Sequence, residues 1–112
     1  MNKNLSTLIN RLKNEDLYID ILFDKDTQIS ALEFDSRKVV DGTLFFALPG
    51  THVHGNTFIS SAIKNGAVAI VFQDTLSTET IELAKVNHIP LIKVSDSRFA
   101  MAPISDEFYD SP

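Results

Sequence analysis

The 112-residue sequence contains no cysteine, which excludes a disulfide framework, a thiolate metal site and a cysteine nucleophile. Two motifs are also absent: the G-x-S-x-G of serine hydrolases and the G-x-x-x-x-G-K-[ST] loop that cradles phosphates. No run approaches the ~20 apolar residues of a membrane-spanning helix, and the first residues are too polar for a signal peptide. We therefore expect a cytoplasmic protein, not associated with membranes, that carries no catalytic set of its own.

Positive charge is also scarce, because ten lysines and arginines stand against fifteen aspartates and glutamates, for a net charge of −5. Binding to the phosphates of nucleic acid requires a clustered basic surface, which these scattered residues do not supply. Hydrophobic residues make up 44% and charged residues 22%, a balance typical of folded rather than disordered chains. The length suits one domain, and we expect no nucleic-acid partner.

Residues 35–72 organise the predicted fold. An apolar strand at 44–48, a polar loop, an amphipathic helix and a continuously apolar strand at 67–72 follow one another. The order strand, helix, strand predicts a parallel pair, and ligands of such sheets bind beyond the carboxyl ends of the strands. We therefore expect the functional groups in the loops at 34–37 and 49–56.

The helix between these two strands has recognisable ends. Asn56 is suited to cap its start, and Gly66 suits the left-handed position that follows a helix. Its apolar face consists of Phe58, Ile59, Ala62 and Ile63. The unbroken apolar run that follows predicts a strand covered on both of its faces.

The rest of the chain continues the alternation of helices and strands. Helices are predicted at 5–13 and 76–86, strands at 29–34 and 90–94, and residues 17–22 are ambiguous between a strand and a helical turn. A third helix begins after Ser95 or Asp96, and Pro103 inside it predicts a kink or a restart. The fold class is α/β: a three-layer α/β/α domain with a mixed, largely parallel sheet of four or five strands.

Two loop motifs have both a structural and a functional interpretation. In Asp35-Ser36-Arg37, Asp35 can accept backbone hydrogen bonds and pair with Arg37, or the Ser36 hydroxyl can face a ligand. The residues alone favour the structural interpretation. The loop at 50–56 is either a plain connection or a segment whose glycines let a ligand approach the backbone, next to the start of a helix.

A metal site is the weaker alternative for the second loop. Its His-Val-His at 52–54 has the spacing of a chelating pair in a strand, but no third ligand stands nearby in the sequence. We therefore interpret His52 and His54 as surface polar residues and expect no metal site in this chain.

Read together, two motifs resemble the N-terminal domain of the Mur ligases. They are D-S-R-x-V-x-x-G-x-L-F-x-A-x-x-G from residue 35 and G-x-x-F-I-x-x-A-I-x-x-G-A-x-A-I-V from residue 55, and the resemblance extends from about residue 29 to 112. It implies a three-domain ligase that uses ATP and Mg2+, with residues 1–112 as its single N-terminal UDP-substrate-binding domain. The central ATPase domain and the C-terminal domain would then lie outside this chain, which alone is expected to be inactive.

The resemblance also implies a substrate, UDP-N-acetylmuramoyl-L-alanyl-D-glutamate, and a monomer that docks on its own central domain. The closing F-Y-x-x-P at 108–112 resembles the member that adds the third amino acid to this substrate. The alternatives are the member that adds D-Ala-D-Ala and a non-catalytic interaction module. Which amino acid the parent enzyme adds depends on a pocket outside this chain.

The uridine contacts of the family carry over onto five residues of this sequence: Phe34, Ser36, Thr51, His52 and Val53. The last three depart from a common H-Q-A of the family. If the family's contacts there run through backbone groups, the departure is tolerable, whereas contacts through side chains would change the affinity or the pose.

Overall fold

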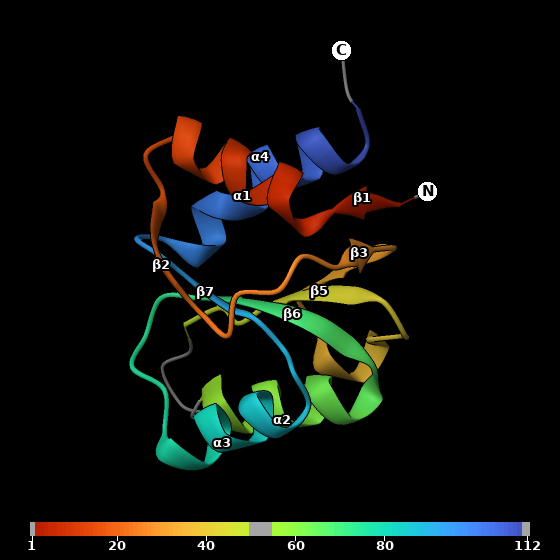
Figure 1. Ribbon diagram of the computed structural model, residues 1–112, viewed down its shortest axis with the longest axis vertical. Coiled ribbons are helices and arrows are strands. Elements are labelled where there is room, and N and C mark those ends of the chain that lie inside the picture. The colour runs from red at the N-terminus through yellow and green to blue at the C-terminus, as the bar shows by residue number, and fades with distance from the viewer. Residues whose placement is uncertain (1, 50–54, 111–112) are drawn as a thin grey trace.

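The computed structural model describes residues 2–49 and 55–110, and a five-stranded sheet runs through the middle of it (Figure 1). The strands, in their order across the sheet, are β2 (Tyr18–Leu22), β7 (Leu91–Val94), β6 (Ala67–Phe72), β5 (Thr43–Phe46) and β4 (Ala31–Glu33). Strands β4 to β7 are parallel to one another, and β2 is antiparallel to β7. The predicted mixed, largely parallel sheet is confirmed, and the ambiguous segment at 17–22 is a strand.

Two pairs of helices cover the two faces of this sheet, which confirms the three layers (Figure 1). The first pair is α1 (Leu5–Asn14) and α4 (Ser97–Phe108); the second is α2 (Gly55–Asn65) and α3 (Thr78–Val86). A short 3-10 helix, η1 (Ser36–Lys38), lies beside α2, and β1 (Lys3–Asn4) pairs with β3 (Gln28–Ile29) in a small separate sheet. No helix among the described residues is long and apolar enough to cross a membrane.

The core has two halves because successive side chains of a strand point to opposite faces of the sheet. On β5, Leu44 and Phe46 pack in the half under α1 and α4, whereas Phe45 packs in the half under α2 and α3. Strand β6 contributes to both halves, as its unbroken apolar run predicts. Both faces of the sheet are therefore closed, and its open parts are the strand ends and the edges.

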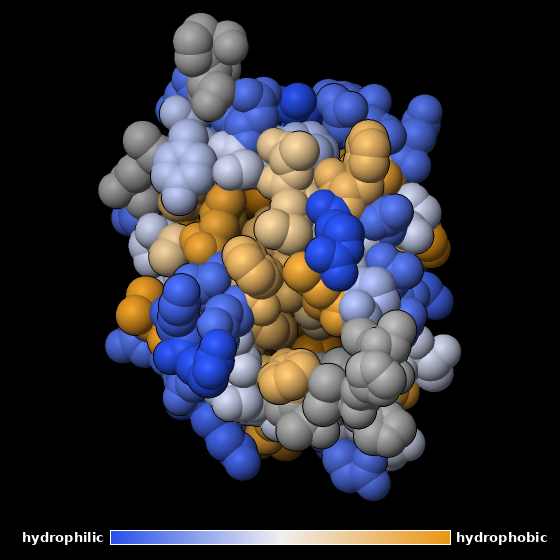
Figure 2. Space-filling model, turned by 180° about the vertical axis from the view of Figure 1, so that it is seen from behind, coloured by the Kyte–Doolittle hydropathy of each residue, from blue (hydrophilic) through white to orange (hydrophobic). Residues whose placement is uncertain are grey.

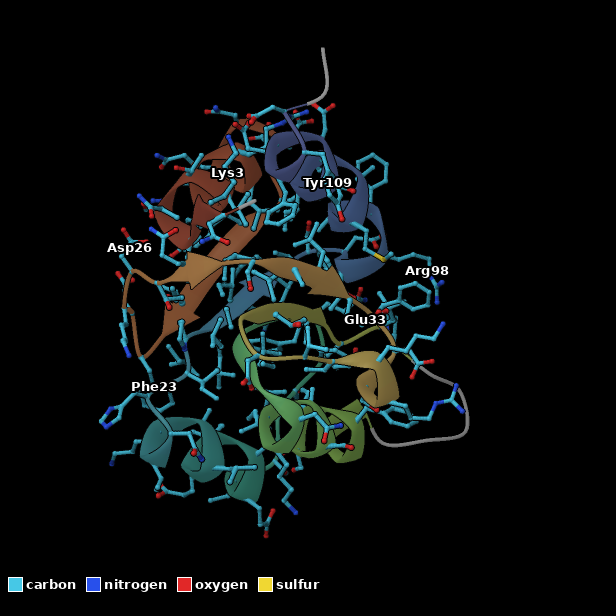
Figure 3. All side chains as sticks on the ribbon, turned by 90° about the vertical axis from the view of Figure 1, so that its right-hand side faces the viewer. Lys3, Phe23, Asp26, Glu33, Arg98 and Tyr109 are labelled. Atoms are coloured by element: carbon cyan, nitrogen blue, oxygen red, sulfur yellow. The ribbon has the colours of Figure 1, made fainter. Side chains whose placement is uncertain are left out.

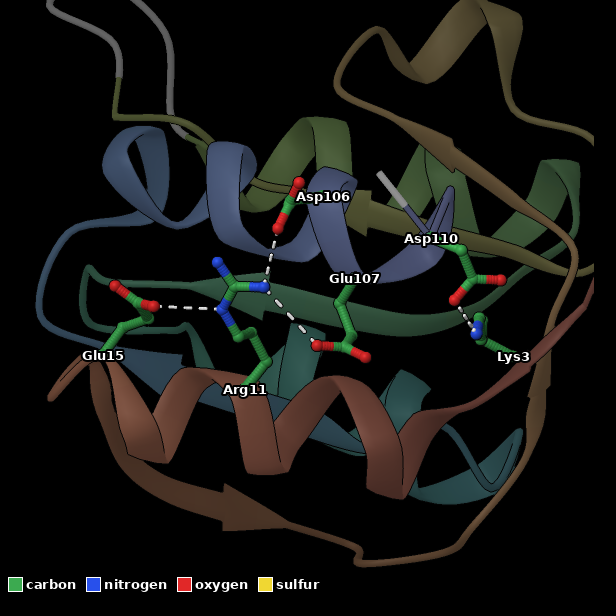
Figure 4. A network of polar contacts seen from close by, with 6 residues as sticks. All are labelled: Lys3, Arg11, Glu15, Asp106, Glu107 and Asp110. Carbon is green, nitrogen blue, oxygen red and sulfur yellow. Dashed lines mark hydrogen bonds and ion pairs between the residues drawn. The ribbon is translucent and has the colours of Figure 1, made fainter. Parts of the chain in front are cut away.

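Four ion pairs lie where α1 and α4 meet, and the two from Arg11 to Asp106 and Glu107 join the helices. The four pairs join Arg11 to Glu15, Asp106 and Glu107, and Lys3 to Asp110 (Figure 4). The Arg11 Nη1 atom lies 2.9 Å from Asp106 Oδ2, and this hydrogen bond, more than that to Glu15, raises the pKa of Arg11 above its ordinary value. Arg11 therefore stays charged and links the two helices of one layer.

The predicted strand at 29–34 is divided in the structure. Residue Ser30 belongs to neither β3 nor β4: its amide donates to Gly42 O at 2.9 Å, where the chain passes from the small sheet to the large one. The strand predicted at 44–48 is shorter, because β5 ends at Phe46.

One prediction about the helix termini is wrong and two are confirmed. Helix α2 begins at Gly55, so Asn56 lies inside it instead of capping it. Of the kink or restart predicted at Pro103, the restart is not found, because α4 runs unbroken through that residue. The carbonyl that loses its donor belongs to the exposed Phe99, so the loss occurs near solvent. Asp96 caps α4 by accepting the Phe99 amide at 2.8 Å, and Gly66 has φ +120°, a left-handed conformation.

Candidate functional site

The carboxyl ends of the parallel strands lie together on one side of the molecule. Figure 3 shows two residues on that side: Glu33, the last residue of β4, and Arg98, in the first turn of α4, the helix that follows β7. Phe23 and Asp26 lie on the opposite side. The right of Figure 3 is the rear of Figure 1, so these strand ends face the side that Figure 2 shows, where apolar side chains gather around a hollow. This is the side on which sheets of this type bind ligands.

A hollow of about 390 Å³ lies directly beyond the end of β4. It is lined by Phe34, Asp35, Ser36 and Arg37, and by Phe58 from the first half of α2. Phe34 is 56% exposed and Phe58 is 42% exposed, whereas Ser36 is only 6% exposed. Two accessible aromatic rings and a sheltered serine therefore line one concave surface.

Asp35 and Arg37 shape the loop at 34–37. Asp35 Oδ1 accepts the Arg37 amide at 3.0 Å and Arg37 Nε at 3.0 Å, and Asp35 Oδ2 accepts Arg37 Nη2 at 2.9 Å. The bonds from the Arg37 side chain, and then the one from its amide, lower the pKa of Asp35 from 3.8 to about 2. Because this pKa is lowered, the pair stabilises the loop above pH ~4, and that contribution is lost as the pH falls through about 2.

Glu33 and Asn65 hold the same loop from its two sides. Glu33 Oε2 accepts the amides of Phe34 at 3.0 Å and Asp35 at 3.2 Å. Asn65, the last residue of α2, donates its Nδ2 to the carbonyl of Ser36 at 2.9 Å. Within the described part of the chain, the hydrogen bond between Ser36 and Asn65 therefore uses the Ser36 carbonyl and not its hydroxyl.

The structure brings together the two predicted site residues that it describes. Phe34 and Ser36 line one hollow, while the structural interpretation of Asp35 and Arg37 is also confirmed by their hydrogen bonds. The other predicted contacts, Thr51, His52 and Val53, lie outside the described residues, as does His54. Among the described residues, no group of three or more histidines, aspartates or glutamates is placed to hold a metal ion.

Phe58 is the residue of the hollow that the sequence did not identify. It was predicted as part of the apolar face of its helix, but the buried stripe consists of Ile59, Ala62 and Ile63. These positions follow the i, i+3, i+4 spacing, but Phe58 also stands four positions before Ala62, so this periodicity gave no signal that its ring is exposed.

Comparison with known proteins settles the family. The model of the Mur ligase family, catalytic domain, matches residues 28–109. The chain belongs to the Mur ligase family. It is 39% identical over 87 residues to the UDP-N-acetylmuramoyl-L-alanyl-D-glutamate–2,6-diaminopimelate ligase of Haemophilus influenzae, covering 78% of this chain and 18% of that protein. It is 45% identical over 84 residues to the ligase of the same name from Geobacillus kaustophilus, covering 75% of this chain and 15% of that protein.

A solved structure shows the same fold. Crystal structure I of MurF from Acinetobacter baumannii superposes on this chain with a TM-score of 0.69. The superposition covers 96% of this chain and 21% of the MurF chain. Its sequence identity of 19% supports likeness of fold alone. The chain spans less than a fifth of the length of the relatives that it matches in sequence.

The residues of this chain do not fit a site for ATP and Mg2+, which the family implies for the whole enzyme. The glycine-rich loop with lysine that cradles a triphosphate is absent from the sequence. The described residues also place no carboxylate cluster for a hard cation. The hollow beyond β4 instead presents aromatic rings and a serine, residues suited to recognition of a ligand.

Proposed function

We propose that this chain is the N-terminal, UDP-binding domain of the ligase that adds the third amino acid to UDP-N-acetylmuramoyl-L-alanyl-D-glutamate in peptidoglycan synthesis. The observation that carries the proposal is the hollow beyond β4, in which Phe34, Ser36 and Phe58 meet. The identity of 39–45% to two diaminopimelate-adding ligases supports this choice within the family.

The chemistry of the hollow suits a nucleoside. A base can stack on the exposed rings of Phe34 and Phe58, an interaction of about 1–3 kcal/mol per base in proteins that bind single-stranded nucleic acid. Ser36, which lines the same hollow and is largely buried, carries a hydroxyl that can hydrogen-bond such a ligand. Thr51, His52 and Val53 complete the proposed uridine site.

In the proposed parent enzyme, a central domain binds ATP and Mg2+ and a C-terminal domain binds the incoming amino acid. Residues 1–112 form one domain that anchors the nucleotide end of the substrate, in a cytoplasmic monomer that docks on its own central domain. The chain alone is then inactive as a ligase, because the groups that activate the glutamate carboxylate lie on those other domains.

The corresponding domain of the D-Ala-D-Ala-adding ligase is the second candidate. The superposition with MurF has a TM-score of 0.69, but its sequence identity of 19% supports likeness of fold alone. The sequence identity to the diaminopimelate-adding ligases is about twice as high, over three quarters of the chain. We therefore prefer the third-amino-acid ligase. A non-catalytic interaction module remains the third candidate, and nucleotide binding distinguishes it from the first two.

Titration with UDP is the direct test of the proposed function. Amide NMR shifts are expected to cluster at Phe34 to Arg37 and at Thr51 to His54, because these segments follow the strand ends. The affinity is expected to be weak, since a partial site rarely offsets the cost of association. The absence of any shift would favour the interaction module, and shifts confined to residues 76–90 would overturn the placement of the site.

Replacing Ser36 by alanine tests the role of its hydroxyl. The change is expected to weaken UDP binding by about 0.5–1.5 kcal/mol, the net contribution of one hydrogen bond. The melting temperature is expected to stay nearly constant, because the bond to Asn65 uses the Ser36 carbonyl. Calorimetric titration and thermal unfolding measure the two quantities.

Ser30→Ala is the matched control for this variant. Ser30 is exposed and precedes β4, at the end of the strand away from the hollow, so its loss is expected to leave UDP binding unchanged. A large loss of stability in Ser36→Ala with unchanged UDP affinity would show that the hydroxyl serves the fold instead of the ligand.

A further inference from the structure

Among the described residues, Asn65 is the distant side chain that hydrogen-bonds the 34–37 loop. Its Nδ2 donates to the Ser36 carbonyl at 2.9 Å across 29 positions of sequence. The other hydrogen bonds of this loop, among the described residues, are local: Glu33 accepts the amides of Phe34 and Asp35, and Asp35 accepts the amide of Arg37. Local bonds determine the shape of a loop, whereas a bond from another element determines where the loop lies.

The element that supplies this bond also supplies a wall of the hollow. Helix α2 carries Phe58 in its first half and Asn65 at its end. The hydrogen bond from Asn65 thus joins the loop that carries Phe34 and Ser36 to the helix that carries Phe58. Phe34, Ser36 and Phe58 line the same hollow. Ser36 is nearly buried, so this hydrogen bond is partly sheltered from competing water.

We propose that Asn65 is a positioning residue for ligand binding in the hollow, an inference that rests on the proposed UDP-binding function. Asn65 keeps the loop in the placement in which Phe34 and Ser36 face Phe58. Without this bond, the loop occupies that placement for a smaller fraction of the time. Apparent affinity falls in proportion to that fraction, so Asn65 acts on the ligand without contacting it.

Asn87 provides a matched control, because it stands at the corresponding end of the neighbouring helix. It caps α3, and its Nδ2 donates to Leu83 O at 2.8 Å, a carbonyl of its own helix. Asn65→Asp and Asn87→Asp each place one negative charge at the unfavourable end of a helix dipole. Only the change at residue 65 also removes the donor to the 34–37 loop, since an ionised carboxylate accepts hydrogen bonds but donates none.

The experiment measures UDP affinity, amide hydrogen exchange and melting temperature for Asn65→Ala, Asn65→Asp, Asn87→Ala and Asn87→Asp. Both changes at Asn65 are expected to weaken UDP binding by about 2- to 10-fold, the range of one lost hydrogen bond. Exchange of the Arg37 and Lys38 amides is expected to rise in the same two variants without ligand. The variants at Asn87 are expected to match the unaltered chain in affinity and in exchange of those amides.

Each other result counts against the inference. Unchanged UDP affinity in Asn65→Ala would overturn it, and a loss seen only in Asn65→Asp would assign the effect to charge repulsion. Equal losses of affinity in the Asn87 variants would show a general effect of stability. If the unaltered chain binds no UDP, the proposed function fails and the inference falls with it, whereas failure of the inference alone leaves UDP binding by the unaltered chain intact.

Discussion

Replacing Gly66 by alanine is expected to lower the free energy of unfolding by roughly 2–4 kcal/mol. Gly66 has φ +120°, a conformation that residues with a Cβ atom rarely adopt. A Cβ atom there would lie 2.8 Å from both Cα and N of Asp41. The backbone has little room to shift, because the Gly42 amide donates to the Gly66 carbonyl at 3.1 Å. Denaturant unfolding measures the loss.

Gly42→Ala is the matched comparison, and its cost is expected to be smaller. Gly42 also has positive φ, +87°, so both variants share the conformational penalty. The closest atom to its added Cβ is the Ser30 hydroxyl oxygen at 2.1 Å, at the end of a side chain that can rotate. An equal or larger loss in Gly42→Ala would contradict the assignment of the Gly66 effect to the Asp41 backbone.

Replacing Phe45 by alanine is expected to cost about 3–5 kcal/mol of stability. Phe45 is 1% exposed in β5, and it lies in the half of the core under α2 and α3. The flanking strands β4 and β6 limit how far the structure can collapse into the cavity. Thermal and denaturant unfolding are expected to agree on the size of this loss.

Phe58→Ala is expected to show the opposite pattern, because Phe58 is 42% exposed at the hollow. Its loss of stability is expected to be about 1 kcal/mol or less, while UDP affinity falls by about 1–3 kcal/mol, the range for base stacking. Destabilisation by Phe58→Ala as large as that by Phe45→Ala would contradict the division between a core and a ligand-facing phenylalanine.

The central βαβ unit was predictable because its signals are local. The apolar run at 67–72 and the stripe of Ile59, Ala62 and Ile63 specify burial directly, and β6 and α2 are found there. The confirmed Mur ligase resemblance rests on motifs in the same stretch. Local sequence also specified the turn around Asp35, since its carboxylate needs only its neighbour Arg37.

The features that sequence missed depend on contacts between distant segments. The break at Ser30 arises because β3 pairs with the residues that precede α1, and β4 pairs with β5. Phe58 lines the hollow because the 34–37 loop lies beside α2, the helix whose Asn65 donates to the Ser36 carbonyl. Of the five predicted site residues, Phe34 and Ser36 lie at the hollow, and Thr51, His52 and Val53 remain predictions.

The antiparallel strand β2 protects one edge of the sheet. It covers β7, whose Leu91 and Ile92 are fully buried, and it forms one outer edge of the five strands. The irregular register between Tyr18 and Asp20, and the acidic Asp20 itself, make β2 a poor template for a further strand. Because β2 pairs with a strand some seventy positions later, its attachment requires closure of a long loop. Loss of this strand would uncover the apolar edge of β7, so release of β2 is expected to promote aggregation.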